Sequence, residues 1–264
     1  MSSTTPTPPP SSLTERRKAE TRMEIARVAA GLFVRHGLRA TRAEDIAQAA
    51  GIAPRTFYRY FATKEEAVAP LYATGAQRWV EAVRAAPPGG GVLRALEQGV
   101  HHTLTPGVGV SVSSWEWVRT LLRLAEATPS LGRVWAEVCQ ASERRLGEVL
   151  AERVTRAGSS RAGGVSETGG VSETGGASGA DGASGASRAS GAGGDSGAGD
   201  NVAVAGEVPV VTPDLRFAAA VAGAAVRAAL EAWAAGDGPV EGPDGPVELA
   251  LRNLAALRDF PWGQ

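Results

Sequence analysis

The sequence of 264 residues contains one cysteine, three histidines and only 5% aromatic residues. One cysteine cannot form a disulfide within the chain, and no Cys/His spacing matches a structural zinc site, so we expect a reducing, cytoplasmic location and no metal. The N-terminal residues lack the apolar segment of a signal peptide, and no run of 18 apolar residues occurs that could cross a bilayer. These absences predict a protein without a membrane partner.

Sequence signatures of catalysis are absent as well. No glycine-rich phosphate loop follows a strand pattern, no G-x-S-x-G motif occurs, and no histidine and carboxylate recur at catalytic spacing. The adjacent His101 and His102 would point to different faces of a helix, so they do not predict a metal site. We therefore expect neither enzymatic activity nor a cofactor.

The low net charge of −1 conceals an uneven distribution. Residues 1–78 contain 12 basic and 7 acidic side chains, a net charge of +5, and the remaining residues carry −6. A basic segment joined to an acidic one is typical of a chain in which one part binds nucleic acid and the other does not.

Glycine and proline are also concentrated in particular segments. Residues 1–12 contain four prolines and predict a disordered tail. Between Gly158 and Asp200, 32 of 43 residues are Gly, Ser or Ala, including two copies of GGVSET. Because such a segment has little to bury, it predicts a flexible insertion over residues 158–206 within a helical domain. A boundary between two independent domains is the alternative.

The rest of the chain has the apolar period of helices and predicts an all-α fold. Thr41 and Glu44 have the spacing of a capping box, as do Thr63 and Glu66, and Pro70 predicts a kink in the helix that follows. The helices are expected over residues 15–36, 42–50, 54–61, from 63 onward, 91–104, 112–128, 129–156, 213–235 and 246–259.

Residues 42–50 and 54–61, joined by Gly51-Ile52-Ala53, have the lengths and the turn of a helix-turn-helix spanning residues 42–61. Phe57 and Phe61 are four residues apart and should pack inward. The opposite face of the second helix would then be free to enter the major groove of DNA.

The stretch from Ala26 to Val68, ARVAAGLFVRHGLRATRAEDIAQAAGIAPRTFYRYFATKEEAV, resembles the TetR family of bacterial transcriptional regulators. Ala53 departs from the family pattern, which often has a capping serine there. The resemblance implies a three-helix DNA-binding domain over residues 13–68. It also implies that residues 69–264 form a helical effector-binding and dimerisation domain.

Carried over position by position, the resemblance implies base contacts by Arg55, Thr56 and Tyr58, with Arg59 in reach. It implies phosphate contacts by Thr41 or Arg42, Tyr60 and Lys64. The alternatives are that Arg42 and Arg59 are simply solvated, that Tyr58 fills the helix surface, and that Tyr60 belongs to the core. Lys64 stands at a helix start, where the helix dipole disfavours it, so a phosphate partner would account for it.

The C-terminal helices carry apolar stripes that either form the core of one chain or pack against a second chain. The predicted dimer interface consists of Phe217, Val221, Ala225, Ala228 and Leu254. A weaker similarity to the subgroup with acyl-CoA-like effectors draws attention to an apolar pocket, although its tryptophans could equally be core. The predicted pocket residues are Trp115, Trp117, Leu121, Leu122 and Trp135, and Cys139 is interpreted as a small buried apolar residue.

Together these features predict a homodimeric TetR-type repressor that binds a palindromic double-stranded DNA operator. An apolar small molecule, acyl-CoA-like or of another kind, would release it. We expect it in the bacterial cytoplasm, associated with the nucleoid when bound to DNA. The alternative is an architectural DNA-binding protein that responds to no ligand.

Overall fold

The computed structural model describes residues 13–108, 112–163 and 209–260. These residues form helices and short connections, and no β-strand occurs among them, which confirms the predicted all-α fold. The predicted tail and most of the predicted insertion lie outside the described residues. The helices are α1 (Leu13–His36), α2 (Ala43–Ala49), α3 (Pro54–Tyr60), α4 (Ala69–Ala85), α5 (Gly91–Leu104), α6 (Val112–Ala127), α7 (Pro129–Gly163), α8 (Pro213–Ala235) and α9 (Pro246–Ala255), with 3-10 turns at Glu65–Val68 and Pro88–Gly90.

Three helix boundaries differ from the predicted ones by more than two residues. Helix α7 continues past Arg156 to Gly163, so the first residues assigned to the insertion, 158–163, are helical. Helix α9 ends at Ala255 rather than Asp259. Pro70 does not kink a helix, because a 3-10 turn precedes it and α4 begins at Ala69, leaving the proline in the first turn where its missing N–H costs nothing.

Helices α1, α2 and α3 form an N-terminal unit around the buried side chains of Ile25, Phe33, Ile46 and Phe57. The chain leaves α1 at Gly37 (φ 82°) and turns between α2 and α3 at Gly51 (φ 68°). Both glycines adopt the left-handed conformation that a side chain disfavours, which is why the sequence ends its helices there.

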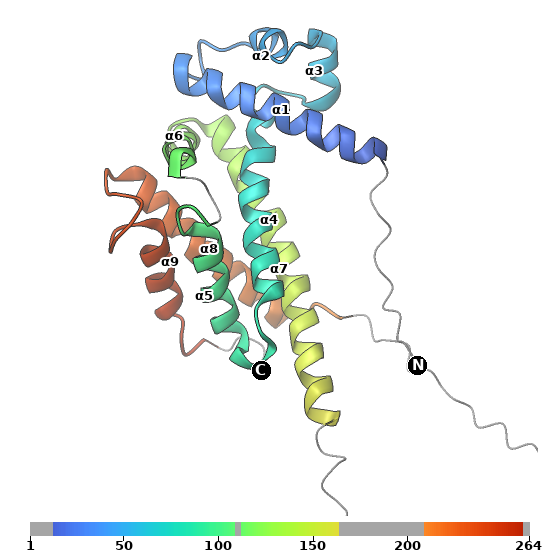
Figure 1. Cartoon of the computed structure of the whole chain (residues 1–264), viewed down its shortest axis with the longest axis vertical. Coiled ribbons are helices and arrows are strands. Elements are labelled where there is room, and N and C mark those ends of the chain that lie inside the picture. Colours follow the sequence, from blue (N-terminus) through green and yellow to red (C-terminus); the bar gives the residue numbers. More distant parts are fainter. Residues whose placement is uncertain (1–12, 109–111, 164–208, 261–264) are drawn as a thin grey trace, which may run out of the picture.

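Helices α4 to α9 form a C-terminal body below the N-terminal unit (Figure 1). Helix α4 runs from the N-terminal unit along the long helix α7, and α7 also packs against α8, which packs against α9. By length and composition α8 could cross a membrane. In this fold it packs against α6, α7 and α9, and its apolar character comes largely from alanine.

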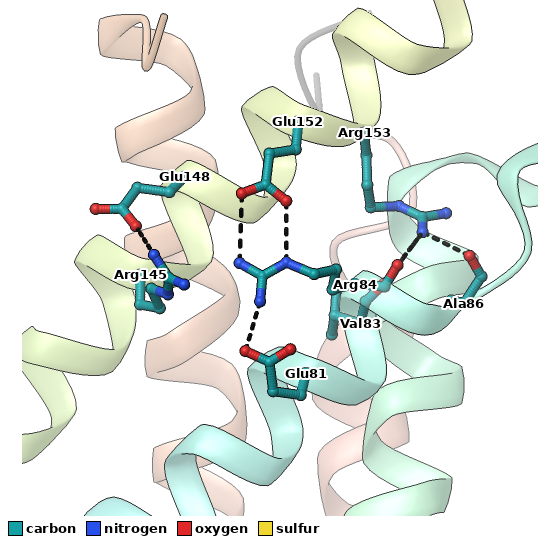
Figure 2. Close-up of polar contacts among 8 residues, drawn as sticks. All are labelled: Glu81, Val83, Arg84, Ala86, Arg145, Glu148, Glu152 and Arg153. Atoms are coloured by element: carbon teal, nitrogen blue, oxygen red, sulfur yellow. Dashed lines mark hydrogen bonds and ion pairs between the residues drawn. The ribbon is translucent and has the colours of Figure 1, made fainter. Parts of the chain in front are cut away.

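Polar contacts fix the far end of α4 against α7 (Figure 2). The Arg84 Nε atom lies 2.9 Å from a Glu152 carboxylate oxygen. The guanidinium of Arg153, which is 8% exposed, donates to the carbonyl oxygens of Val83 at 3.1 Å and Ala86 at 2.7 Å. The Val83 carbonyl also accepts from the Ala86 N–H at 3.3 Å, and Arg153 adds a second donor, from α7, to the carbonyls at the end of α4.

Candidate nucleic-acid interface and ligand cavity

Helix α3 is held on α1 by its buried face and by its last carbonyl. Phe57 is fully buried and its ring centroid lies 5.6 Å from that of Phe61. The Arg22 guanidinium of α1 lies over the Phe61 ring at 4.6 Å and donates to the Tyr60 carbonyl oxygen at 2.7 Å. Since Ala53 supplies no side-chain cap at the start of α3, these contacts with α1 fix the orientation of the helix.

The opposite side of α3 faces solvent. Arg55, Tyr58 and Arg59 are exposed, and Thr56 is half-buried beside them. Tyr58 leaves 53% of its surface open, although an aromatic side chain gains free energy by burial. Two guanidinium groups and an aromatic ring on one short, rigid helix form a surface suited to base edges and phosphates.

Thr41 does not belong to this surface. It is 2% exposed, and its hydroxyl donates to the Gly37 carbonyl oxygen at 2.9 Å, which contradicts the predicted phosphate contact by its side chain. The predicted capping box is also displaced by one residue, because the Asp45 carboxylate accepts from the Arg42 N–H at 2.7 Å. Arg42 itself is exposed.

Lys64 has partners inside the protein. Its ammonium donates to the carbonyl oxygens of Leu38 at 2.7 Å and Thr41 at 2.8 Å, so it ties the loop after α1 to the start of the next turn. These bonds account for a cation at a helix start without a phosphate. Tyr60 is half-buried, and the Arg59 guanidinium lies 5.5 Å from the centre of its ring.

Sequence reasoning missed Glu44, an acidic group within this basic surface. Its carboxylate lies 3.5 Å from Arg42 Nε and 3.5 Å from the Tyr58 hydroxyl. Because its negative charge would repel phosphate, Glu44 must be matched by a base-edge donor or a cation when DNA binds. Sequence reasoning assigned Glu44 to the capping box with Thr41 and therefore did not consider it as part of this surface.

A cavity of about 160 Å³ lies in the C-terminal body, between α4, α5, α6, α7 and α8. Four of the five predicted pocket residues line it: Trp115, Leu121, Leu122 and Trp135. Sequence reasoning missed most of the remaining wall, because the residues that α4, α5, α7 and α8 contribute have the spacing of ordinary core. Among these are Tyr72, Trp79, Cys139, Glu143 and Arg227.

Titratable groups of the cavity wall are perturbed by their burial. Loss of water raises the pKa of the Cys139 thiol to about 12, so the thiol stays protonated. Burial likewise raises the pKa of Tyr72, whose hydroxyl donates to the Leu121 carbonyl oxygen at 2.9 Å. The pKa of Glu143 is raised for the same reason, against a smaller lowering by Arg227.

Trp117 is the predicted pocket residue that lies elsewhere. It is 41% exposed, and its ring approaches α1, where its Cη2 atom would lie 3.3 Å from a Cβ atom placed on Gly31. Glycine at position 31 therefore allows this close approach. Helix α6 thus lines the cavity with Trp115 and contacts α1 with Trp117.

The predicted dimer-interface residues divide into two groups. Phe217 is 62% exposed, Ala228 is exposed, and Val221 and Ala225 are half-buried, so the described residues leave this side of α8 incompletely covered. Leu254 is fully buried in the core of one chain, and the prediction that it contacts a second chain is wrong. Its helix, α9, turns Leu254 toward α8, where the neighbouring Asn253 donates to the Ala225 carbonyl oxygen at 2.9 Å.

The basic three-helix unit with its exposed α3 defines a helix-turn-helix transcriptional regulator. The family model for bacterial regulatory proteins of the tetR family matches residues 25–69. The chain is 32% identical over 159 residues to the HTH-type transcriptional regulator TcmR of Streptomyces glaucescens, a match that covers 57% of this chain and 68% of that protein. It therefore belongs to the TetR family of bacterial transcriptional regulators, as the Ala26–Val68 segment predicted.

Other relatives match over less of their length or at lower identity. The HTH-type transcriptional repressor KstR2 of Rhodococcus jostii is 47% identical over 62 residues, which is 24% of this chain and 30% of KstR2. A solved structure of a TetR-family regulator from Mesorhizobium loti superposes with a TM-score of 0.44 at 17% identity, over 91% of this chain and 96% of that one.

Proposed function

We propose that this protein is a homodimeric repressor that occupies a palindromic DNA operator and leaves it when an apolar small molecule fills the cavity of the C-terminal body. In this proposal residues 13–68 bind DNA, and residues 69–264 bind the effector and the second chain. The protein acts in the cytoplasm, on the nucleoid when bound to DNA, and has no enzymatic activity.

One observation carries the proposal: α6 contacts both the cavity and the DNA-binding unit. Trp115 and Leu121 line the cavity, and Trp117 of the same helix lies against Gly31 of α1. Helix α1 in turn holds α3 through Arg22 and the Tyr60 carbonyl. A ligand that shifts α6 would therefore shift α3 as well.

In a dimer, a shift of α3 changes the distance between the two recognition helices. Two recognition helices must lie about 34–36 Å apart to reach successive major grooves, so a ligand that favours another spacing lowers operator affinity. The incompletely covered side of α8, with Phe217 at its N-terminal end, supports pairing with a second chain. Phe217→Glu should leave a folded monomer, which sedimentation velocity would detect.

The test is footprinting of the full chain on the DNA that flanks its own gene, at several salt concentrations. We expect a protected palindrome whose affinity falls steeply with salt, since phosphate contacts release counterions. Absence of any protected site, or binding indifferent to salt, would overturn the proposal. If the palindrome is protected but no apolar compound releases it, the chain is instead a DNA-binding protein without an effector.

A further inference from the structure

Several residues that line the cavity carry a buried polar atom without a partner. Five buried side-chain nitrogen or oxygen atoms have no hydrogen-bond partner within the part of the chain that the structure describes: Trp79 Nε1, Thr103 Oγ1, Trp115 Nε1, Arg119 Nε and Ser142 Oγ. Four of them belong to cavity-lining residues, and Arg119 is the exception. Such an atom costs free energy because it has lost water and gained nothing in exchange.

The other tryptophans of this region provide a contrast. Trp135 also lines the cavity, but its indole N–H donates to the Glu231 carboxylate at 2.7 Å. The Trp233 indole N–H donates to the Pro239 carbonyl oxygen at 3.1 Å. Trp79 and Trp115 are 6% and 1% exposed, so they are buried like Trp233, which is 2% exposed, but lack such a partner. An indole N–H can only donate, so the group that matches it is an acceptor.

The size and charge of the cavity restrict the molecule further. Its volume, about 160 Å³, is close to the roughly 150 Å³ of an apolar cavity that holds benzene. Two charged side chains line it, Glu143 and Arg227, and their charges cancel. One arginine is too little for the several phosphate charges of a coenzyme A thioester, so the mostly apolar lining favours a neutral molecule.

We infer that the cavity takes a neutral, ring-sized apolar compound bearing a hydrogen-bond acceptor oxygen, such as an aryl ketone. That oxygen accepts from the indole N–H of Trp79 or Trp115, with the hydroxyls of Thr103 and Ser142 as further partners. This inference rests on the proposed function only in identifying the cavity with the effector site.

Acetophenone and ethylbenzene form a matched pair for the test, because they differ in a carbonyl in place of a methylene. Both are titrated into the ¹⁵N-labelled full chain, and the indole N–H resonances are followed by NMR after assignment with single Trp→Phe variants. We expect acetophenone to move the Trp79 or Trp115 indole proton downfield and ethylbenzene to leave it nearly unchanged. The indole resonances of Trp135 and Trp233, which already have acceptors, serve as internal controls.

Binding affinities give a second readout. Because the ketone is better hydrated than the hydrocarbon, the two Kd values are compared as a ratio within each variant, so that the difference in hydration cancels between variants. The ratio of the acetophenone Kd to the ethylbenzene Kd should rise about tenfold in Trp79→Phe or in Trp115→Phe, the effect of one lost hydrogen bond. Trp135→Phe is the control and should leave the ratio unchanged. If a variant fails to fold, the indole shifts of the wild-type chain still decide the matter.

The inference is overturned if neither compound binds, if the ratio is the same in all three variants, or if both compounds move the same indole protons equally. Release from operator DNA is measured separately. If acetophenone binds as expected but does not release the operator at saturation, the ligand class stands and the ligand-induced release in the proposed function fails.

Discussion

Arg153 offers the sharpest test of how the C-terminal body is held together. Its guanidinium donates to the carbonyl oxygens of Val83 at 3.1 Å, Ala86 at 2.7 Å and Pro87 at 2.9 Å, all at the end of α4. Burial lowers the pKa of Arg153, with a further lowering by Arg156. The guanidinium nevertheless remains charged, because arginine is not deprotonated in proteins. With the Arg84 carbonyl oxygen at 3.4 Å, the side chain thus replaces its lost hydration with four backbone acceptors.

We expect Arg153→Met to lower the free energy of unfolding by about 3 kcal/mol. A hydrogen bond to a charged donor contributes about 1.5–3 kcal/mol, and the cost of burying the guanidinium offsets part of the sum. Methionine keeps an apolar stem of similar length but removes the guanidinium donor from these carbonyls, of which Val83 keeps the Ala86 N–H. For a body of this size the melting temperature should fall by about 6–12 °C.

Arg145 is the matched control, on the same helix and in the same view (Figure 2). It pairs with Glu148 across side chains that are 54% and 48% exposed, so Arg145→Met should cost less than about 0.5 kcal/mol. Urea denaturation of both variants must use one protein concentration, because a dimer links stability to concentration. If Arg153→Met costs no more than Arg145→Met, the capping role assigned to Arg153 is wrong.

Three further predictions concern the two sites. Arg55→Ala should weaken operator binding by about 1–3 kcal/mol in fluorescence anisotropy and leave binding to random DNA unchanged, since we propose that this exposed arginine of α3 contacts a base. An equal loss on both DNAs would instead assign Arg55 to a phosphate contact. Lys64→Met should lower the melting temperature, because the carbonyl oxygens of Leu38 and Thr41 lose their donor. The salt dependence of DNA binding should stay unchanged. A drop of about 1 in the slope of log K against log salt would instead support a phosphate contact. Cys139 should react with iodoacetamide at pH 8 far more slowly than free cysteine. The reason is that burial raises the pKa of its thiol to about 12, and only the thiolate is the nucleophile. A rate equal to that of free cysteine would contradict the place of Cys139 in the cavity wall.

Local rules explain how much the sequence revealed. The helix-turn-helix depends on contacts within a few residues, such as the left-handed glycines 37 and 51 and the pair Phe57 and Phe61, so its position followed from spacing. The family followed from the same segment. The roles of Thr41 and Lys64 did not, because their partners come from a loop whose carbonyls are placed by the packing of α1.

The sequence by itself therefore determined the helices, the basic N-terminal unit and the side of α3 that faces solvent. Only the tertiary structure decided which residues of the C-terminal body meet. Trp115 and Trp117 are two positions apart and so about 200° apart around α6, which sends one into the cavity and the other against α1. Leu254 turned out to be core for a similar reason, since the rotation of α9 about its axis is fixed by packing against α8. Periodicity shows that a helix has an apolar face, but the neighbouring helices decide what that face contacts.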